Sequence, residues 1–174
     1  MEGDAFLNHI WGLQPRGWVF MSRRMGGRSG VWQELPIDLA VHDRVQLGAK
    51  HLNNGDLYFC PNSFSANVRR KHLCLPSRLM YQDLDEADPQ DLPVAPELWW
   101  ETSPGRYQAL WVLDQPIEPV ELAQLNRALN RACHADPGTW NLTRMLRVPG
   151  SWNEKRGVRV SRAYGKDDEL RAAA

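Results

Sequence analysis

The chain has 174 residues, of which 43% are hydrophobic and 24% charged, and its formal net charge at pH 7 is zero. This composition is ordinary for a globular protein, and the length suits one domain or two small lobes that share a core. The sequence lacks the run of roughly 18 apolar residues that a membrane helix needs, a signal-peptide pattern, and the cysteine spacing of a disulfide framework or zinc site. We therefore expect a cytoplasmic protein without a membrane partner.

The first half of the chain predicts short elements joined by polar turns. Asp4 can cap a helix that ends at Gly12, and Pro36 suits the first turn of a second helix that runs to about Leu52. Strands are expected at 18–21, 31–35 and 57–60. Between these elements the sequence predicts a Gly- and Arg-rich loop at 23–30, a turn at 53–56, and a loop or one short helix at 65–76.

The second half predicts a strand-rich domain with one good helix. An acidic strand from about 79 to 85 is followed by two aromatic-rich strands, 97–102 and 107–113, which form a hairpin with a tight polar turn. The helix spans about 120–134, because its leucines fall on one face. Further strands are expected at 142–148 and 158–164, followed by a tail or linker at 166–174. This order favours an α+β fold whose antiparallel sheet is covered by helices on one face.

The charges are distributed unevenly. The segment 82–118 holds nine Asp or Glu residues and one Arg, whereas other segments are basic. An acidic strand flanked by basic segments suits a ligand that carries phosphates and needs a metal, although charge runs are more often solvated faces. The candidate nucleic-acid contacts in the basic segments are Arg23, Arg24, Arg69, Arg70 and Lys71.

Asp83 and Asp85 are the strongest candidates for chemistry. Successive side chains of a strand alternate between its faces, so these two carboxylates are expected on one face, with Cα atoms roughly 6.5 Å apart. Two like charges at this separation favour a cation between them. Because oxygen ligands suit Mg²⁺ or Mn²⁺ better than Zn²⁺, we predict that these residues bind Mg²⁺ or Mn²⁺. Taken alone, the pair also fits a strand that ends in a solvated acidic turn.

Two later stretches complete the pattern. The hairpin turn can offer backbone N–H groups and the Ser103 hydroxyl to phosphates, with Gly105 allowing close approach and Arg106 adding charge. Further along, Arg144 and Arg147 lie three residues apart, so a regular strand would turn them to opposite faces and at most one would face the metal site. We prefer Arg147, Asn153 and Lys155 as phosphate or sugar contacts.

The order and spacing of these stretches resemble the archaeo-eukaryotic primase superfamily, in particular primase-polymerases of plasmids, phages and integrated elements. The most specific feature is Leu-Arg-Val-Pro-Gly-Ser-x-Asn-x-Lys at residues 146–155, behind a Trp-Asn-Leu-Thr segment at 140–143. The resemblance covers roughly 57–160. It implies an N-terminal α/β lobe (about 1–78) beside an RRM-like antiparallel sheet (79–165), with the site in the cleft between them.

By this resemblance the chain is a primase-polymerase domain that binds a single-stranded DNA template or primer, an NTP or dNTP, and two divalent metals. It would add nucleotides and release pyrophosphate, in the cytoplasm of a bacterium, an archaeon or a host cell of a phage or plasmid. A helicase domain or protein is a further expected partner. The nucleotide contacts implied are Ser103, Gly105, Arg106, Tyr107, Gln108, Arg144, Arg147, Asn153 and Lys155.

Two positions depart from the family pattern. Asn141 stands where the superfamily usually carries a third metal-binding Asp, and an amide oxygen brings no charge to a metal. Gln108 stands where a His commonly contacts the nucleotide phosphates, and Gln cannot become cationic. These departures leave open a nucleotide- or single-strand-binding module without turnover. A metal-dependent nuclease is a weaker alternative, because the scattered histidines supply no convincing metal cluster.

Overall fold

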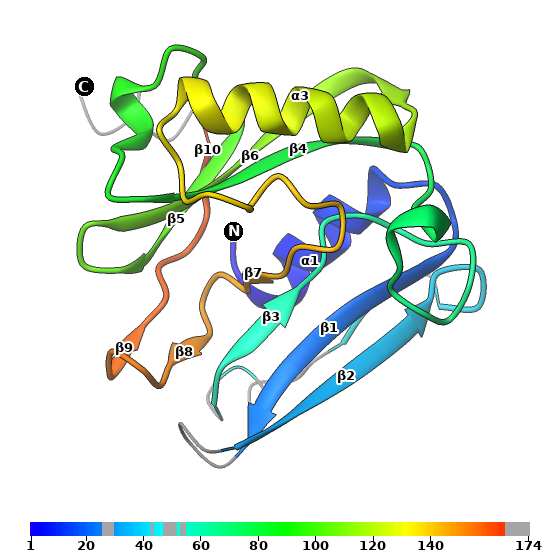
Figure 1. The fold of residues 1–174 in the computed structure, drawn as a ribbon. Helices are drawn as coiled ribbons and strands as arrows, with labels where there is room; N and C mark the ends of the chain where they lie inside the picture. Colours follow the sequence, from blue (N-terminus) through cyan, green and yellow to red (C-terminus); the bar gives the residue numbers. More distant parts are fainter. Residues whose placement is uncertain (26–29, 43, 47–51, 53–54, 166–174) are drawn as a thin grey trace.

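The computed structural model describes residues 1–25, 30–42, 44–46, 52 and 55–165, and it shows two four-stranded antiparallel sheets with two main helices (Figure 1). The predicted α+β class is therefore confirmed. The helices are α1 (Gly3–Gly12) and α3 (Pro119–Ala132), with short 3₁₀ turns η2 (Lys71–Leu73) and η3 (Pro89–Asp91). The strands are β1 (Trp18–Met25), β2 (Val31–Asp38), β3 (Leu57–Phe59), β4 (Ser77–Asp85), β5 (Leu98–Ser103), β6 (Arg106–Ile117), β7 (Leu146–Arg147), β8 (Trp152–Asn153), β9 (Val158–Arg159) and β10 (Tyr164–Gly165).

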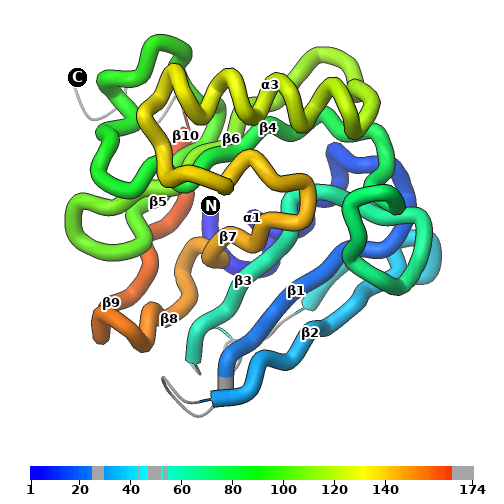
Figure 2. The backbone as a smooth tube through the Cα atoms, viewed as in Figure 1, coloured from blue at the N-terminus to red at the C-terminus, as the bar shows by residue number. Residues whose placement is uncertain are grey.

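The first sheet has the order β2-β1-β3-β7 and the second has the order β10-β5-β6-β4. Strands β8 and β9 form a separate small ribbon. The first sheet takes strands from residues 18–59 and the second from residues 77–165, except that β7 comes from the second half of the chain and pairs with β3 in the first sheet. The colour ramp of Figure 2 shows this return, since the orange segment lies beside the cyan one. Strand β7, which belongs to the segment with the most specific motif, thus connects the first sheet to the second half of the chain.

Helix α1 and the inner faces of both sheets build the main core. The centre of the Phe6 ring lies 5.2 Å from the ring centres of Phe59 in the first sheet and of Trp100 in the second. Trp100 is fully buried, whereas its neighbour Trp99 is half-buried on the other face, as strand alternation predicts. Large aromatic side chains in such positions supply much of the burial that stabilises a domain of this size.

Helix α3 covers the opposite face of the second sheet (Figure 1). Its buried Asn126 and Asn130 bind the strand below, because Gln82 Nε2 donates to the Asn126 carbonyl at 2.7 Å and Asn130 Nδ2 donates to Gln82 Oε1 at 2.9 Å. Alternation along β4 therefore turns Gln82 toward α3 and its neighbour Asp83 away from it, toward the side on which the first sheet lies.

Several predicted elements differ from the structure. The expected loop at 23–30 is wrong for its first residues, since Arg23 and Arg24 belong to β1. The helix expected from Pro36 is wrong at its start, because Pro36 lies in β2 opposite Phe20. An eight-residue hairpin register outweighs the local helix signal there, and an edge strand tolerates the missing proline N–H. Parts of that predicted helix, of the turn at 53–56, and all of the tail lie outside the described residues.

The expected strand at 142–148 is reduced to the two residues of β7, and the one at 158–164 is divided into β9 and β10. In the first case, turns at 139–145 take the chain away from the sheet. No helix in the described part of the chain is long and apolar enough to cross a membrane.

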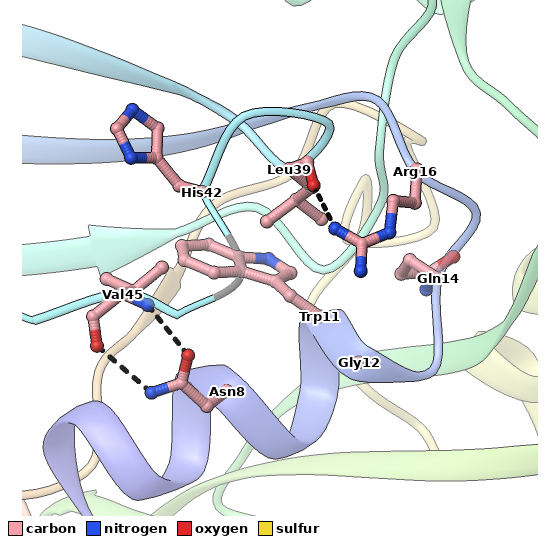
Figure 3. A pocket seen from close by; sticks show the side chains of 8 residues that line it. All are labelled: Asn8, Trp11, Gly12, Gln14, Arg16, Leu39, His42 and Val45. Carbon is pink, nitrogen blue, oxygen red and sulfur yellow. Dashed lines mark hydrogen bonds between the residues drawn. The ribbon is translucent and has the colours of Figure 1, made fainter.

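A small pocket of about 110 Å³ lies at the C-terminal end of α1 (Figure 3). Asn8 fixes the segment 44–46 against this helix, because its amide donates to the Val45 carbonyl and accepts from the Val45 N–H. We interpret this pocket as a gap in the packing between α1 and the residues that follow β2.

Candidate functional site

A pocket of about 250 Å³ gathers the predicted acidic and basic residues from both sheets. It lies where the ends of β4, β5 and β6 approach β3 and β7. Nine predicted site residues line it, together with four that sequence reasoning missed. The predicted ones are Asp83, Asp85, Ser103, Arg106, Gln108, Arg144, Arg147, Asn153 and Lys155, and the additional ones are Tyr58, Thr102, Met145 and Arg156.

Asp83 lies near the end of β4, opposite Gln108 of β6. Its side chain is 23% exposed, and its Oδ2 accepts a hydrogen bond from the Arg144 guanidinium at 2.9 Å. The carboxylate is therefore largely removed from solvent and held by a charge-assisted hydrogen bond, which fixes its direction.

Asp85 ends β4 in a strained conformation. Its φ is +51°, and the pairing register with β6 shifts between Asp83 and Asp85. Regular alternation does not hold across this bulge, so the simple argument that put both aspartates on one face is wrong in its geometry. Both nevertheless line the same pocket. The Asp85 carboxylate is ion-paired with Arg106, which also reaches Glu86 at 3.0 Å.

The β5–β6 turn lies beside the end of β4 and contributes to the pocket. Gly105 has φ of +70°, which favours glycine, and its N–H donates to Glu101 Oε1 at 2.7 Å. Ser103 is buried in the pocket wall. Tyr107, by contrast, is not among the lining residues: its ring packs edge-on against Trp99 at 5.9 Å. Of this turn, Ser103 and Arg106 therefore contribute side chains to the pocket.

Arg144 and Arg147 both line the pocket, which corrects the expectation that they face opposite sides. The strand covers only Leu146–Arg147, so Arg144 lies before it in a turn. The alternation of side chains between the two faces of a strand therefore does not apply to Arg144. Arg147 is ion-paired with the buried Asp56, and its guanidinium lies 4.6 Å from the centre of the Tyr58 ring. Its backbone N–H donates to Gln108 Oε1 at 2.9 Å, so Gln108 links the two sheets.

Asn153 and Lys155 follow β7 on the next segment. Asn153 Nδ2 donates to the Thr102 carbonyl at 2.8 Å and is almost fully buried, so it positions the β5–β6 turn. Lys155 and Arg156 are exposed at the pocket rim. Cationic groups of this kind can bind phosphate oxygens without breaking an internal ion pair.

Asn141 is exposed and lies outside the pocket lining. Its side-chain oxygen accepts from the Thr143 N–H at 3.2 Å and from the Thr143 hydroxyl at 3.0 Å, which makes it a turn-forming residue. Asp136 lies closer to the acidic pair. Its N–H donates to the Asp83 carbonyl at 3.0 Å, and its carboxylate shares the Arg144 guanidinium with Asp83 at 3.5 Å.

The predicted nucleic-acid contacts do not form one surface. Direct cross-strand partners share a face, so Arg24 lies with its partner Trp32 while Arg23 points to the other side of the first sheet. The Arg69 guanidinium pairs with Glu34 at 2.6 Å and donates to the Thr143 carbonyl. Arg70 is exposed, and the Lys71 ammonium lies 5.4 Å from the centre of the Trp140 ring.

Tyr58 has no distinctive sequence signal, because it lies in a strand of three residues between polar turns. Burial raises the pKa of Tyr58 to about 12. The phenol would be protonated at neutral pH even at its ordinary pKa of about 10, so the hydroxyl is an uncharged group in the pocket lining. Only the pairing of β3 with β7 brings it beside Arg147.

The donor set fits a divalent cation with oxygen ligands. Asp83 and Asp85 supply two carboxylates to one pocket, each now compensated by an arginine, and hard oxygen ligands suit Mg²⁺ or Mn²⁺. Among the described residues, no group of three or more His, Cys, Asp or Glu side chains is close enough to hold a metal. A cation here would therefore depend on these two carboxylates and on the substrate's own phosphates.

Comparison with known proteins identifies the family of the chain. The RepB DNA-primase N-terminal domain family matches residues 79–173, which is more than half of the chain. The chain belongs to this family. It is a primase-type domain, and the resemblance to primases of mobile elements is confirmed. No curated protein matches the sequence.

Solved structures show the same fold for this primase-type domain. The archaeo-eukaryotic primase domain of the cyanophage S-2L primase-polymerase superimposes with a TM-score of 0.69 at 14% identity, covering 93% of this chain and 89% of that one. The primase RepB′ superimposes with a TM-score of 0.61 at 18% identity, covering 92% of this chain and 54% of that one. Its catalytic domain, solved in complex with initiator DNA, gives a TM-score of 0.61 at 20% identity, with coverages of 88% and 80%.

Proposed function

We propose that this primase-type domain catalyses template-directed transfer of nucleotides from an NTP or dNTP to make or extend a primer on single-stranded DNA. The observation that carries the proposal is the pocket in which Asp83 and Asp85 face five cationic side chains from separate parts of the chain. These cations are Arg106, Arg144, Arg147, Lys155 and Arg156. Carboxylates among cations suit a triphosphate that arrives with Mg²⁺ or Mn²⁺.

The chain's own residues would mainly bind and orient the nucleotide. Metal ions held by Asp83 and Asp85 would supply charge neutralisation at the reacting phosphate and at the leaving pyrophosphate. Arg106 and Arg144 lie directly beside these carboxylates, so each can turn from its aspartate to a phosphate oxygen. Lys155 and Arg156 at the rim would hold the outer phosphates.

The direct test is nucleotide incorporation by the chain on primed and unprimed single-stranded DNA with Mg²⁺ or Mn²⁺. We expect extended products of the primed template that disappear when a chelator removes the metal. Nucleotide binding without product under every metal condition would instead support the second candidate, a binding module without turnover. Asn141, with no charge where a third acid is usual, is the observation that favours that candidate.

Asp136 and Asn141 can be distinguished as partners of the acidic pair. Asp136 touches the Arg144 side chain that holds Asp83, whereas the Asn141 side chain is used within its own turn. We expect Asp136→Asn to lower incorporation about 10- to 100-fold, as loss of supporting contacts around metal sites typically does. It should also raise the metal concentration needed for half-maximal activity.

The matched change Asn141→Asp is expected to alter incorporation by less than about threefold, because its side chain lies outside the pocket. Metal titrations of both variants check this pair of predictions. A large gain of activity in Asn141→Asp, with Asp136→Asn unaffected, would assign the third position to Asn141 instead.

A further inference from the structure

A second and larger pocket, of about 520 Å³, adjoins the acidic one. The two share the lining residues Tyr58, Arg144 and Met145, so they lie side by side. We call the second part the Trp32 pocket. Its remaining lining residues are Ser22, Trp32, Glu34 and Arg69.

The register of the first sheet builds this pocket. Arg24 pairs with Trp32, and Ser22 pairs with Glu34 on one side and with Tyr58 on the other. Tyr58 in turn pairs with Arg147 of β7. Directly paired residues place their side chains on one face, so a row of side chains runs from the edge strand β2 to the acidic pocket. This face is opposite to the one that packs on α1.

Two aromatic rings dominate the row. Trp32 is 53% exposed, and its ring centre lies 5.2 Å from that of Tyr58. The Arg24 guanidinium lies 5.8 Å from the Trp32 ring centre. The indole therefore has a cation on its own sheet face and a neighbouring ring that limits its movement. Such an arrangement is a stacking platform for a planar group.

The charges in the Trp32 pocket are largely compensated. Arg69 pairs with Glu34, and Arg144 pairs with Asp83. The pocket therefore offers aromatic faces, a thioether and hydrogen-bonding groups, with little net charge for a phosphate. An uncharged planar group with polar edges, such as a nucleobase, fits this lining, while phosphates fit the neighbouring acidic and cationic pocket.

Cationic residues continue beyond the pocket. The Arg69 guanidinium donates to the Thr143 carbonyl and so ties β2 to the segment before β7. Three residues before Thr143, Trp140 has the Lys71 ammonium and the Arg127 guanidinium each 5.4 Å from its ring centre. Aromatic rings with neighbouring cations therefore lie on both sides of the segment that Arg69 contacts, which suits a strand with several bases and phosphates.

We propose that the Trp32 pocket binds a base of the single-stranded DNA template by stacking on Trp32, beside the position of the incoming nucleotide. This inference rests on the proposed function only in naming the strand as template. The physical claim is that single-strand affinity depends on the aromatic face of residue 32, largely independent of base identity, because every base has a π-face.

The test measures the affinity of the full chain for a fluorescein-labelled twelve-nucleotide oligo-dT by fluorescence anisotropy, without metal or nucleotide. Trp32→Ala is expected to weaken binding roughly tenfold, which is a typical loss for one stacking contact. Trp32→Phe keeps an aromatic face and should stay within about threefold of the original affinity. Trp152→Ala is the matched control, since Trp152 is 39% exposed and lines neither pocket.

A second arm separates the two possible sources of the base. The Kd for a free dNTP should be unchanged in Trp32→Ala if the template occupies the pocket. A weaker dNTP affinity with unchanged oligonucleotide affinity would overturn the proposal in favour of the incoming nucleotide. Equal losses in Trp32→Ala and Trp152→Ala, or no loss in either, would also overturn it.

These measurements do not depend on turnover. If the chain incorporates no nucleotide yet binds oligo-dT through Trp32, the proposed function fails and the stacking site stands. If it incorporates nucleotides and Trp32→Ala binds oligo-dT normally, the reverse holds.

Discussion

Replacing Asp83 and Asp85 together by alanine is expected to lower nucleotide incorporation by at least about a thousandfold. The double change removes both carboxylates that could hold a metal in the pocket, and metal charge stabilisation is worth several kcal/mol at a phosphoryl centre. It also leaves Arg106 and Arg144 without these ion pairs. Primer-extension rates at saturating metal and nucleotide provide the measurement.

The control for this experiment is Asp114→Ala, which removes an exposed carboxylate from β6 outside the pocket. We expect it to retain full activity. The double variant should also keep its affinity for single-stranded DNA, because the Trp32 pocket is lined by neither aspartate. Incorporation within about tenfold of the original chain in Asp83→Ala/Asp85→Ala would show that the metal is held elsewhere.

The largest effect on stability is expected from Arg147→Ala. Its partner Asp56 has only 2% relative exposure, and the Asp56 carboxylate also accepts the Glu154 N–H at 3.1 Å. Removing one member of a buried pair leaves the other charge uncompensated and typically costs about 3–5 kcal/mol. Loss of the stacking contact between Arg147 and Tyr58 adds to the effect. Urea unfolding measures the loss in free energy of unfolding.

A second change tests whether the loss of stability comes from the Asp56 carboxylate that Arg147→Ala leaves buried without a counter-charge. In the background of Arg147→Ala, Asp56→Asn should recover part of the lost stability, because an amide can still accept the Glu154 N–H without needing a counter-charge. Arg156→Ala is the matched control: this exposed arginine lines the same pocket, and its removal should change stability by less than about 0.5 kcal/mol. Equal stabilities of Arg147→Ala and Arg156→Ala would contradict the argument.

The local sequence predicted the elements that carry strong, self-contained signals. The α3 region was found because its leucines repeat with helical period, and the β5–β6 hairpin because two aromatic runs flank a turn with glycine. The acidic end of β4 was found by its charge pattern. The motif around Arg147 gave the family resemblance, and with it the fold and most pocket residues.

Long-range pairing decided what local patterns could not. Pro36 lies in β2 because cross-strand register outweighs its helix preference, and Arg144 shares a pocket with Arg147 because the strand between them is only two residues long. Asp56 and Tyr58 lie beside Arg147 only because β3 pairs with β7. The sequence pattern of residues 55–60 does not predict this strand pairing.

The sequence by itself therefore determined the family and the residue types available to the candidate site, since carboxylates, cations and a glycine turn are local features of the chain. Only the tertiary structure decided which cation pairs with which carboxylate. It brings Asp136 into contact with Arg144, whereas the Asn141 side chain bonds Thr143 within its own turn. It also places Trp32 in the lining of the second pocket. The physical reason is that side-chain direction depends on strand register and on bulges such as the one at Asp85, and both are set by contacts between residues far apart in the chain.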